Sequence, residues 1–419
     1  MALRLIILAV GISAAMLALA PLTFSQTPPQ TYLHAGTLID VKAGKSRDAQ
    51  TIIVTGGRIS DVLDGFVPAP DGTATIDLKD GTVLPGLIDA HVHLLMNLGP
   101  QLQIKFLTQT LAEATLDGVV NARATLMAGF TTVQDLGGKN DAIFALRDGI
   151  RAGKVPGPRI LASGSPITPL EESFNRSCSG VAECRRVVRD QILQGADVIK
   201  TLVGGGIQFG GGLPARFSAA ELDAIVKTAE SMGKKVAVHA HGTDGINFAL
   251  QHNVHSIEHG TYLDDTSVTL FRKAGTVLVP TLMAGQVVEA LAANPAAPPA
   301  MRAEAASFTR RLMAAMARAH KGGVTIVLGT DAGAGEHGKN ALELDLMVRA
   351  GLTPMEAIQA GTVAAAKHLN VDAITGVIEV GKAADIIAVI GKDPIADVKA
   401  LQAVDFVMKG GVVYKGGQD

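Results

Sequence analysis

Eight short apolar runs between residues 83 and 370 constrain the fold more than any other feature of this sequence. Each run is followed by a stretch with helical character, such as 218–233, where Ser218 is a suitable N-cap, Glu221 closes a capping box and Gly233 ends the helix. Eight strand and helix pairs predict an α/β fold, a (β/α)8 TIM barrel, which needs about 250 residues. The runs are GLIDAHVHL, FTTVQDL, RILASG, ADVIKTLV, KVAVHAH, VHSIEHG, TVLVPTL and TIVLGTDA.

Both ends of the chain carry β-type runs that are broken by Gly and Asp turns. TIIVTGGRIS and ATIDLKDGTVLPG precede the barrel, and ADIIAVI and DFVMKGGVVYKGG follow it. We therefore predict a small β-sandwich domain that both chain ends form, from residues 26–82 and 371–419, around a barrel at 83–370. A doubly wound sheet is the alternative, but it does not easily explain why polar residues recur at the carboxyl ends of so many runs.

The first 25 residues have the pattern of a secretory signal peptide, with Arg4 before an apolar run that ends near Ala20. Pro21 disfavours cleavage after Ala20, so cleavage after Ser25 is at least as good. A retained N-terminal membrane anchor is the alternative. We expect a secreted or periplasmic protein that does not contact the membrane after cleavage.

Composition narrows the partners and the state of the cysteines. Lys and Arg total 37 against 39 for Asp and Glu, so there is no bulk charge that would attract nucleic acid or an anionic membrane. A small-molecule substrate is the better expectation. In an oxidising compartment Cys178 and Cys184 can form a local disulfide, and two free thiols in a surface loop are the alternative.

Residues that bind metals recur at the ends of the predicted barrel strands. His91 and His93 are two residues apart on the first strand, so both side chains project to the same side and can reach one ion. Active sites of TIM barrels lie at the carboxyl ends of the strands. Imidazole and carboxylate groups suit zinc, although manganese, cobalt or iron would also fit. The later strands add Lys200, His239, His259 and Asp331.

Lys200 is an unusual residue for such a site. A cationic lysine beside divalent metals would be unfavourable, whereas burial and neighbouring positive charge depress its pKa. The neutral amine can then add carbon dioxide, and the resulting carboxylate can bridge two cations. A lysine that is ion-paired or that binds a substrate carboxylate is the alternative.

The ordered motifs PGLIDAHVHL, VIK, VHAH, SIEHG, LGTDAG and GKAADIIAV resemble the amidohydrolase superfamily. They are most similar to the branch of imidazolonepropionase-like proteins, metal-dependent Xaa-Pro dipeptidases and amidohydrolases of ochratoxin-type N-acyl amino acids. The resemblance implies two zinc ions per subunit that carboxylated Lys200 bridges, and a homo-oligomer. It places one metal on His91, His93 and Asp331, and the other on His239 and His259.

This ligand set predicts hydrolysis of the amide bond of an Xaa-Pro type dipeptide or an ochratoxin-like N-acyl amino acid. Water between two cations loses a proton near neutral pH, and the hydroxide attacks a polarised carbonyl while Asp331 moves the proton to the leaving nitrogen. A cyclic amide or lactone hydrolase, or a deaminase, is the alternative within the superfamily. A barrel that has lost its metals and serves only in binding is the alternative outside catalysis.

Four further residues are candidates for contact with the substrate. His241 shares a strand face with His239, so either could be the ligand; the resemblance favours His239 and leaves His241 to bind the substrate or the oxyanion. Tyr262 could polarise the carbonyl or bind a carboxylate, unless it only packs. Arg216 could bind a substrate carboxylate, unless it is a solvated surface residue. His337 resembles a family position that lines the pocket.

Overall fold

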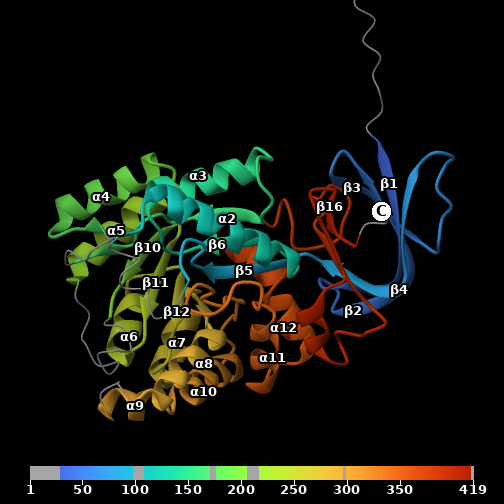
Figure 1. Cartoon of the computed structure of the whole chain (residues 1–419). Coiled ribbons are helices and arrows are strands. Elements are labelled where there is room, and N and C mark those ends of the chain that lie inside the picture. Colours follow the sequence, from blue (N-terminus) through green and yellow to red (C-terminus); the bar gives the residue numbers. More distant parts are fainter. Residues whose placement is uncertain (1–28, 98–107, 170–175, 205–216, 296–298, 417–419) are drawn as a thin grey trace, which may run out of the picture.

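The computed structural model describes residues 29–97, 108–169, 176–204, 217–295 and 299–416. Figure 1 shows two bodies side by side, one of parallel strands surrounded by helices and one of strands from both ends of the chain. The signal-peptide prediction for residues 1–25 and the Arg216 prediction lie outside the described residues. Within the described residues, no helix has the length and apolar character that crossing a bilayer requires.

Seven of the eight predicted runs form strands, and together with two short strands that were not predicted, β8 and β9, they make two parallel sheets. One sheet has the order β13-β12-β11-β10-β8-β9 and the other β5-β6-β7. The eighth run contributes isolated parallel bridges, from Ile326 to Leu278 and from Ala332 to Val92, so it connects the two sheets without being a full strand. The barrel strands are β5 (Leu87–Val92), β6 (Phe130–Asp135), β7 (Arg159–Ala162), β8 (Ile167–Thr168), β9 (Arg176–Ser177), β10 (Ile199–Leu202), β11 (Val236–Ala240), β12 (Ser256–His259) and β13 (Val277–Val279).

The predicted TIM-barrel class is confirmed, with the difference that the described strands do not form one closed ladder. β7 and β10 belong to different sheets. Among the described residues, a backbone hydrogen bond from Asp197 N to Ala162 O, 2.8 Å long, connects the end of β7 to the residues before β10, in place of a continuous ladder. The two strands in this part of the barrel, β8 and β9, have only two residues each.

Helices cover the outside of the parallel strands (Figure 1). Their starts follow local sequence signals: Ser218 and Glu221 form the predicted capping box of α5, and Gly233 follows that helix with a φ of 70°. The helices are α2 (Leu111–Met127), α3 (Asn140–Arg151), α4 (Val181–Leu193), α5 (Ala219–Ser231), α6 (Thr243–Gln251), α7 (Asp265–Ala274), α8 (Leu282–Ala290), α9 (Pro299–Ala305), α10 (Phe308–Lys321), α11 (Leu342–Arg349), α12 (Pro354–Ala360) and α13 (Val363–His368), with short 3-10 helices at Leu291–Ala293 and Val398–Ala403.

The two chain ends combine in one seven-stranded sheet, as the sequence predicts, with the order β16-β15-β14-β4-β1-β2-β3. The sheet curls back on itself, because Ile59 N in β3 donates to Lys382 O, 2.9 Å away, just before β14. Leu33, Ile52 and Phe406 pack inside this curl in a core of their own. The strands are β1 (Gln30–Asp40), β2 (Lys45–Thr55), β3 (Arg58–Asp64), β4 (Ala74–Pro85), β14 (Ile386–Ile390), β15 (Phe406–Lys409) and β16 (Val412–Lys415).

A buried carboxylate joins the sheet domain to the barrel. The Asp385 side chain is buried just before β14. It forms a 2.9 Å ion pair with Arg159 at the start of β7 and accepts a hydrogen bond from Gly410 N. Arg159 also donates to Thr132 on β6. The contact lies at the amino ends of the barrel strands and therefore leaves the opposite, carboxyl end free for a functional site.

The two cysteines form a disulfide, which decides between the alternatives that the sequence left open. Cys178 and Cys184 are bonded across a separation of six residues, and both are buried where α4 begins. The bond therefore fixes the start of α4 against the short strand β9.

Candidate metal centre

Three of the predicted ligands meet where β5 ends. His91 Nε2 and His93 Nε2 lie 3.4 Å apart, and Asp331 Oδ1 lies 3.6 Å from the first and 3.3 Å from the second. The two histidines meet there because they are two residues apart at a strand end. Asp331 reaches them from near the end of the eighth run, where its φ is 57°. A non-glycine residue in this left-handed region is uncommon and is typical of functional sites.

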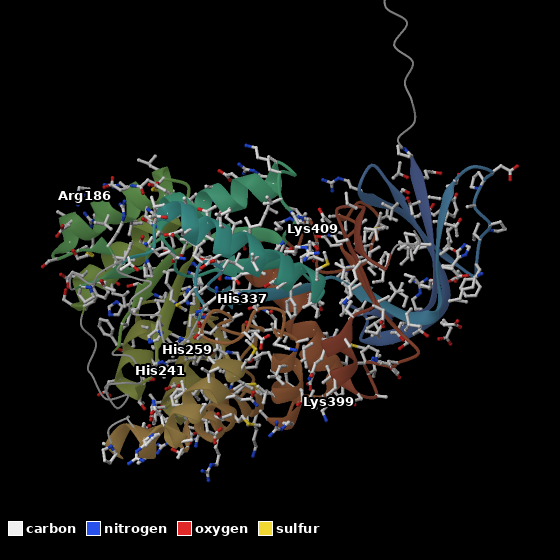
Figure 2. The ribbon with its side chains drawn as sticks, in the orientation of Figure 1. Arg186, His241, His259, His337, Lys399 and Lys409 are labelled. Carbon is white, nitrogen blue, oxygen red and sulfur yellow. A yellow bond between two sulfur atoms is a disulfide. The ribbon has the colours of Figure 1, made fainter. Side chains whose placement is uncertain are left out.

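A second group of imidazoles lies at the ends of β11 and β12. His239 Nδ1 is 2.9 Å from His259 Nε2, and the ring of His241 stacks on that of His259 at 4.6 Å between centroids. Figure 2 shows His241 and His259 beside each other. Ligand atoms of His239, His241 and His259 lie within 4.8 Å of one another, as do those of His91, His259 and Asp331. The two groups therefore share His259 and form one cluster.

Lys200 lies on β10, is 3% exposed, and is near enough to His91, His239 and His259 for its charge to lower their pKa values. Its Nζ is buried and has no hydrogen-bond partner among the described residues. Burial lowers the pKa of this amine, although the charges of Glu258 and Asp331 act in the opposite direction. A buried amine without a partner is unfavourable, so a further group that satisfies this nitrogen would stabilise the site.

Hydrogen bonds on the outer side of the rings orient the histidines. His91 Nδ1 donates to Glu258 Oε2 at 2.8 Å, and His93 Nδ1 donates to Gly137 O at 3.0 Å. Because the Nδ1 atoms carry these protons, the Nε2 lone pair of neutral His91 faces the interior of the cluster. Such outer partners typically fix the tautomer of histidines that bind metals.

Burial keeps most of these rings neutral. It lowers the pKa values of His91, His239 and His259 well below the ordinary range and that of His241 to about 4, with further lowering from neighbouring positive charge. His93 differs: burial lowers its pKa, but the hydrogen bond and charge of Asp331 outweigh burial and raise it overall. Neutral imidazole is the form that binds a metal.

The Asp331 carboxylate is held in its charged form. Burial would raise its pKa, but the hydrogen bond from His93 and the charges around it bring the pKa below the ordinary range. Asp89, buried beneath it on β5, accepts hydrogen bonds from Thr330 N at 3.1 Å and Thr330 Oγ1 at 2.6 Å. Asp89 therefore ties β5 to the residue that precedes Asp331.

The other predicted substrate residues occupy different surroundings. The Tyr262 hydroxyl donates to Glu304 of α9, and Arg311 lies over its ring at 5.3 Å. His337 is buried, and its Nε2 donates to Met96 O at 3.0 Å in the loop after β5. Figure 2 shows His337 away from the stacked pair of His241 and His259.

Sequence reasoning missed several buried residues that surround the ligands. Glu258 is fully buried and pairs in register with His239 across β11 and β12, so it faces the barrel interior. The alternation of strand side chains could have identified Glu258, because it lies on the same face as the predicted ligands. His259, one residue later, is out of phase with that face, and its φ of 72° marks the turn there. Thr281 and Glu343 had no such signal.

The donor set fits a divalent metal ion. It offers neutral imidazole nitrogens and one carboxylate, a combination that suits zinc and related ions. It also leaves two buried nitrogens without partners among the described residues, Lys200 Nζ and His239 Nε2. These orphaned atoms are the observation that a metal-bridging group at Lys200 would explain.

Comparison with known proteins identifies the family. Residues 82–414 match the amidohydrolase family. An ochratoxinase from Aspergillus niger is 30% identical over 434 residues, covering 92% of this chain and 87% of that protein. The solved structure of a Xaa-Pro dipeptidase with bound methionine in the active site is 36% identical, with a TM-score of 0.85, and covers 92% of this chain and 100% of the other. A prolidase complexed with N-methylphosphonate-L-proline is 29% identical, with a TM-score of 0.83 over 92% and 99% of the two chains.

Proposed function

This chain belongs to the amidohydrolase family and is a hydrolase of amide bonds, and we propose that it uses two metal ions to cleave the amide of a dipeptide or an N-acyl amino acid. The observation that carries the proposal is Lys200 Nζ, a buried amine without a partner among the described residues, whose charge acts on the buried histidines around it. Carboxylation of this amine would supply the second carboxylate that the donor set needs.

We assign the ligands in two groups. His91, His93 and Asp331 would hold one ion, His239 and His259 the other, and carboxylated Lys200 would bridge them. Zinc is the preferred metal, with manganese, cobalt or iron as alternatives. When bound, the ions supply Lewis acidity and an activated water.

Asp331 is the proposed general acid and base. Its carboxylate is charged and lies at the strand ends, where it can take the proton of the attacking water and deliver it to the leaving nitrogen. His93 Nε2 lies 3.3 Å from Asp331 Oδ1, so the carboxylate is beside the ring.

His241 is the proposed contact to the substrate or to the tetrahedral oxyanion. Its Nδ1 is hydrogen-bonded to Thr261 Oγ1 at 2.7 Å, which leaves Nε2 for the pocket. His239 has both nitrogens in the interior, which supports His239 as the ligand in preference to His241. Tyr262, His337 and Arg216 remain proposed substrate residues.

The substrate class rests on the relatives. One is named an ochratoxinase and another a Xaa-Pro dipeptidase, so an Xaa-Pro type dipeptide and an ochratoxin-like N-acyl amino acid are the leading candidates. Both have a free carboxylate beside the scissile amide. A secreted or periplasmic homo-oligomer is part of the same proposal.

The test is product analysis by mass spectrometry with the purified, zinc-supplemented protein. The panel contains Xaa-Pro dipeptides, other dipeptides, N-acyl amino acids including ochratoxin A, and lactones. We expect release of a free amino acid that a chelator abolishes and that Lys200→Ala abolishes. Opening of lactones alone would contradict the substrate class, and full activity of Lys200→Ala would favour a deaminase-like site with one metal.

A further inference from the structure

The turn between β13 and α8 has an unusual backbone conformation at Thr281. This residue is fully buried and has a φ of 52°, in the left-handed region that β-branched residues rarely adopt. Such a conformation persists only when the surrounding structure holds it, and it is typical of functional sites. Thr281 is therefore held in this conformation by its neighbours.

The hydroxyl of Thr281 contacts a proposed metal ligand. Its Oγ1 donates to Pro280 O at 2.8 Å and lies 2.7 Å from Nδ1 of His259. A hydroxyl has one proton, and that of Thr281 is directed at the carbonyl oxygen of Pro280. The hydroxyl oxygen therefore accepts a hydrogen bond from His259 Nδ1–H, which leaves the lone pair of His259 Nε2 directed at the cluster.

Glu343 holds the backbone that follows Thr281. This carboxylate comes from α11 and is fully buried. Its Oε1 accepts from Leu282 N at 2.8 Å, and its Oε2 accepts from Met283 N at 2.7 Å. Both carboxylate oxygens are used on the two residues that come directly after Thr281.

We propose that Glu343 is a positioning residue of the metal centre, which acts through Thr281 to fix the tautomer and orientation of His259. The inference rests on the proposed function, because it assumes that His259 binds a metal. Glu343 contacts neither the substrate nor the ligand itself; its effect passes along the backbone from Leu282 to Thr281 and from there to the imidazole.

A role in stability alone is the competing explanation, since a carboxylate at the first turn of a helix stabilises that helix. The two explanations differ in what Glu343→Gln changes. Glutamine keeps one acceptor oxygen but directs an N–H₂ donor at the second backbone N–H. Under our proposal this mismatch disturbs Thr281 and weakens metal binding, whereas under the alternative it only lowers the melting temperature.

The experiment is a zinc titration of the full-length protein in competition with a chromogenic chelator. The variants are Glu343→Gln, Thr281→Val and the double variant. We expect each single variant to bind one of the two zinc ions about 10- to 100-fold more weakly, as is typical for the loss of an outer partner of a ligand. The double variant should bind zinc no more weakly than the single variant with the lower zinc affinity, because both changes interrupt the same connection.

Two further variants keep the test decisive. Thr353→Ala removes the capping box of α12 and should lower the melting temperature without changing zinc affinity. Glu343→Asp keeps the carboxyl group but is too short to reach both N–H groups, so it tests the proposal with an intermediate loss even if Glu343→Gln does not fold.

Three outcomes would overturn the inference. Unchanged zinc affinity in the Glu343 variants would show that the residue only caps the helix. Additive losses in the double variant, or an equal loss in Thr353→Ala, would show that the effect does not pass through Thr281. Absence of zinc binding in the wild-type protein is a different result, since it would refute the proposed function and with it this inference.

Discussion

Replacement of Lys200 with Met should make the metal-free protein more stable while it weakens metal binding. The Nζ of Lys200 is buried without a partner among the described residues, and burial lowers its pKa. Methionine has a similar length and brings no group that needs a hydrogen bond. One substitution should therefore change the two properties in opposite directions.

The expected gain follows from the cost of an unsatisfied buried polar group, about 1–3 kcal/mol. The metal-free Lys200→Met protein should unfold at a higher urea concentration, with the same dependence on urea, because the surface exposed on unfolding is unchanged. The zinc content of the purified variant should fall below that of the wild type, because the bridging carboxylate cannot form.

The pH dependence gives the same reasoning a second check. The pKa of Lys200 is depressed in the folded protein, so the unfolded chain binds more protons and the wild type gains stability as the pH rises toward the ordinary lysine value of about 10.4. The advantage of Lys200→Met should therefore shrink between pH 7 and pH 10. The assay is urea unfolding in the presence of a chelator, at several pH values.

The reasoning would be refuted if metal-free Lys200→Met were less stable than the wild type, because Lys200 would then make a favourable interaction. An advantage that grew with pH would refute the assignment of a depressed pKa. Lys200→Ala serves as the matched control: the space that it leaves should admit a small carboxylic acid, so added formate should restore part of the zinc binding.

Three further predictions concern the reaction, the disulfide and the protonation of the site. Asp331→Asn should lower kcat for amide cleavage by about 10²- to 10⁴-fold; full activity would exclude Asp331 as the proton-transfer group. Replacement of Cys178 and Cys184 by Ser should lower the free energy of unfolding by about 2 kcal/mol, measured by urea denaturation, because the disulfide closes a short loop; an unchanged midpoint would contradict this. The pKa of His241 is lowered to about 4, so the metal-free wild type should lose up to about 3 kcal/mol relative to His241→Asn as the pH falls from 6.5 toward 4; parallel pH curves for the two proteins would refute it.

The barrel strands and the ligands on them could be predicted from sequence because their signals are local. Each apolar run predicts a strand, and alternation then places His91 and His93 on one side of β5. The eighth run was predicted as a strand like the others, but its residues form only isolated bridges at Ile326 and Ala332. Gly329 and the left-handed conformation of Asp331 interrupt regular pairing there.

The groups that orient the ligands could not be predicted in the same way, because they come from distant parts of the chain. Glu343 is 61 residues from Leu282, whose N–H it accepts, and Asp89 is 241 residues from Thr330. No periodicity or spacing connects such pairs. Only the folded arrangement of the two parallel sheets and their connecting loops brings them together, so the residues behind the ligands are found once the fold is known.

These residues behind the ligands explain how several imidazoles can lie close together before any metal is bound. Positive rings at these separations would repel one another, but burial keeps His91, His241 and His259 neutral. Glu258 accepts a hydrogen bond from Nδ1 of His91, and Thr281 accepts one from Nδ1 of His259. These bonds direct the Nε2 atoms of both rings at the interior of the cluster. The protein therefore orders the ligands and settles their protonation during folding, so that binding a metal requires little rearrangement of the chain.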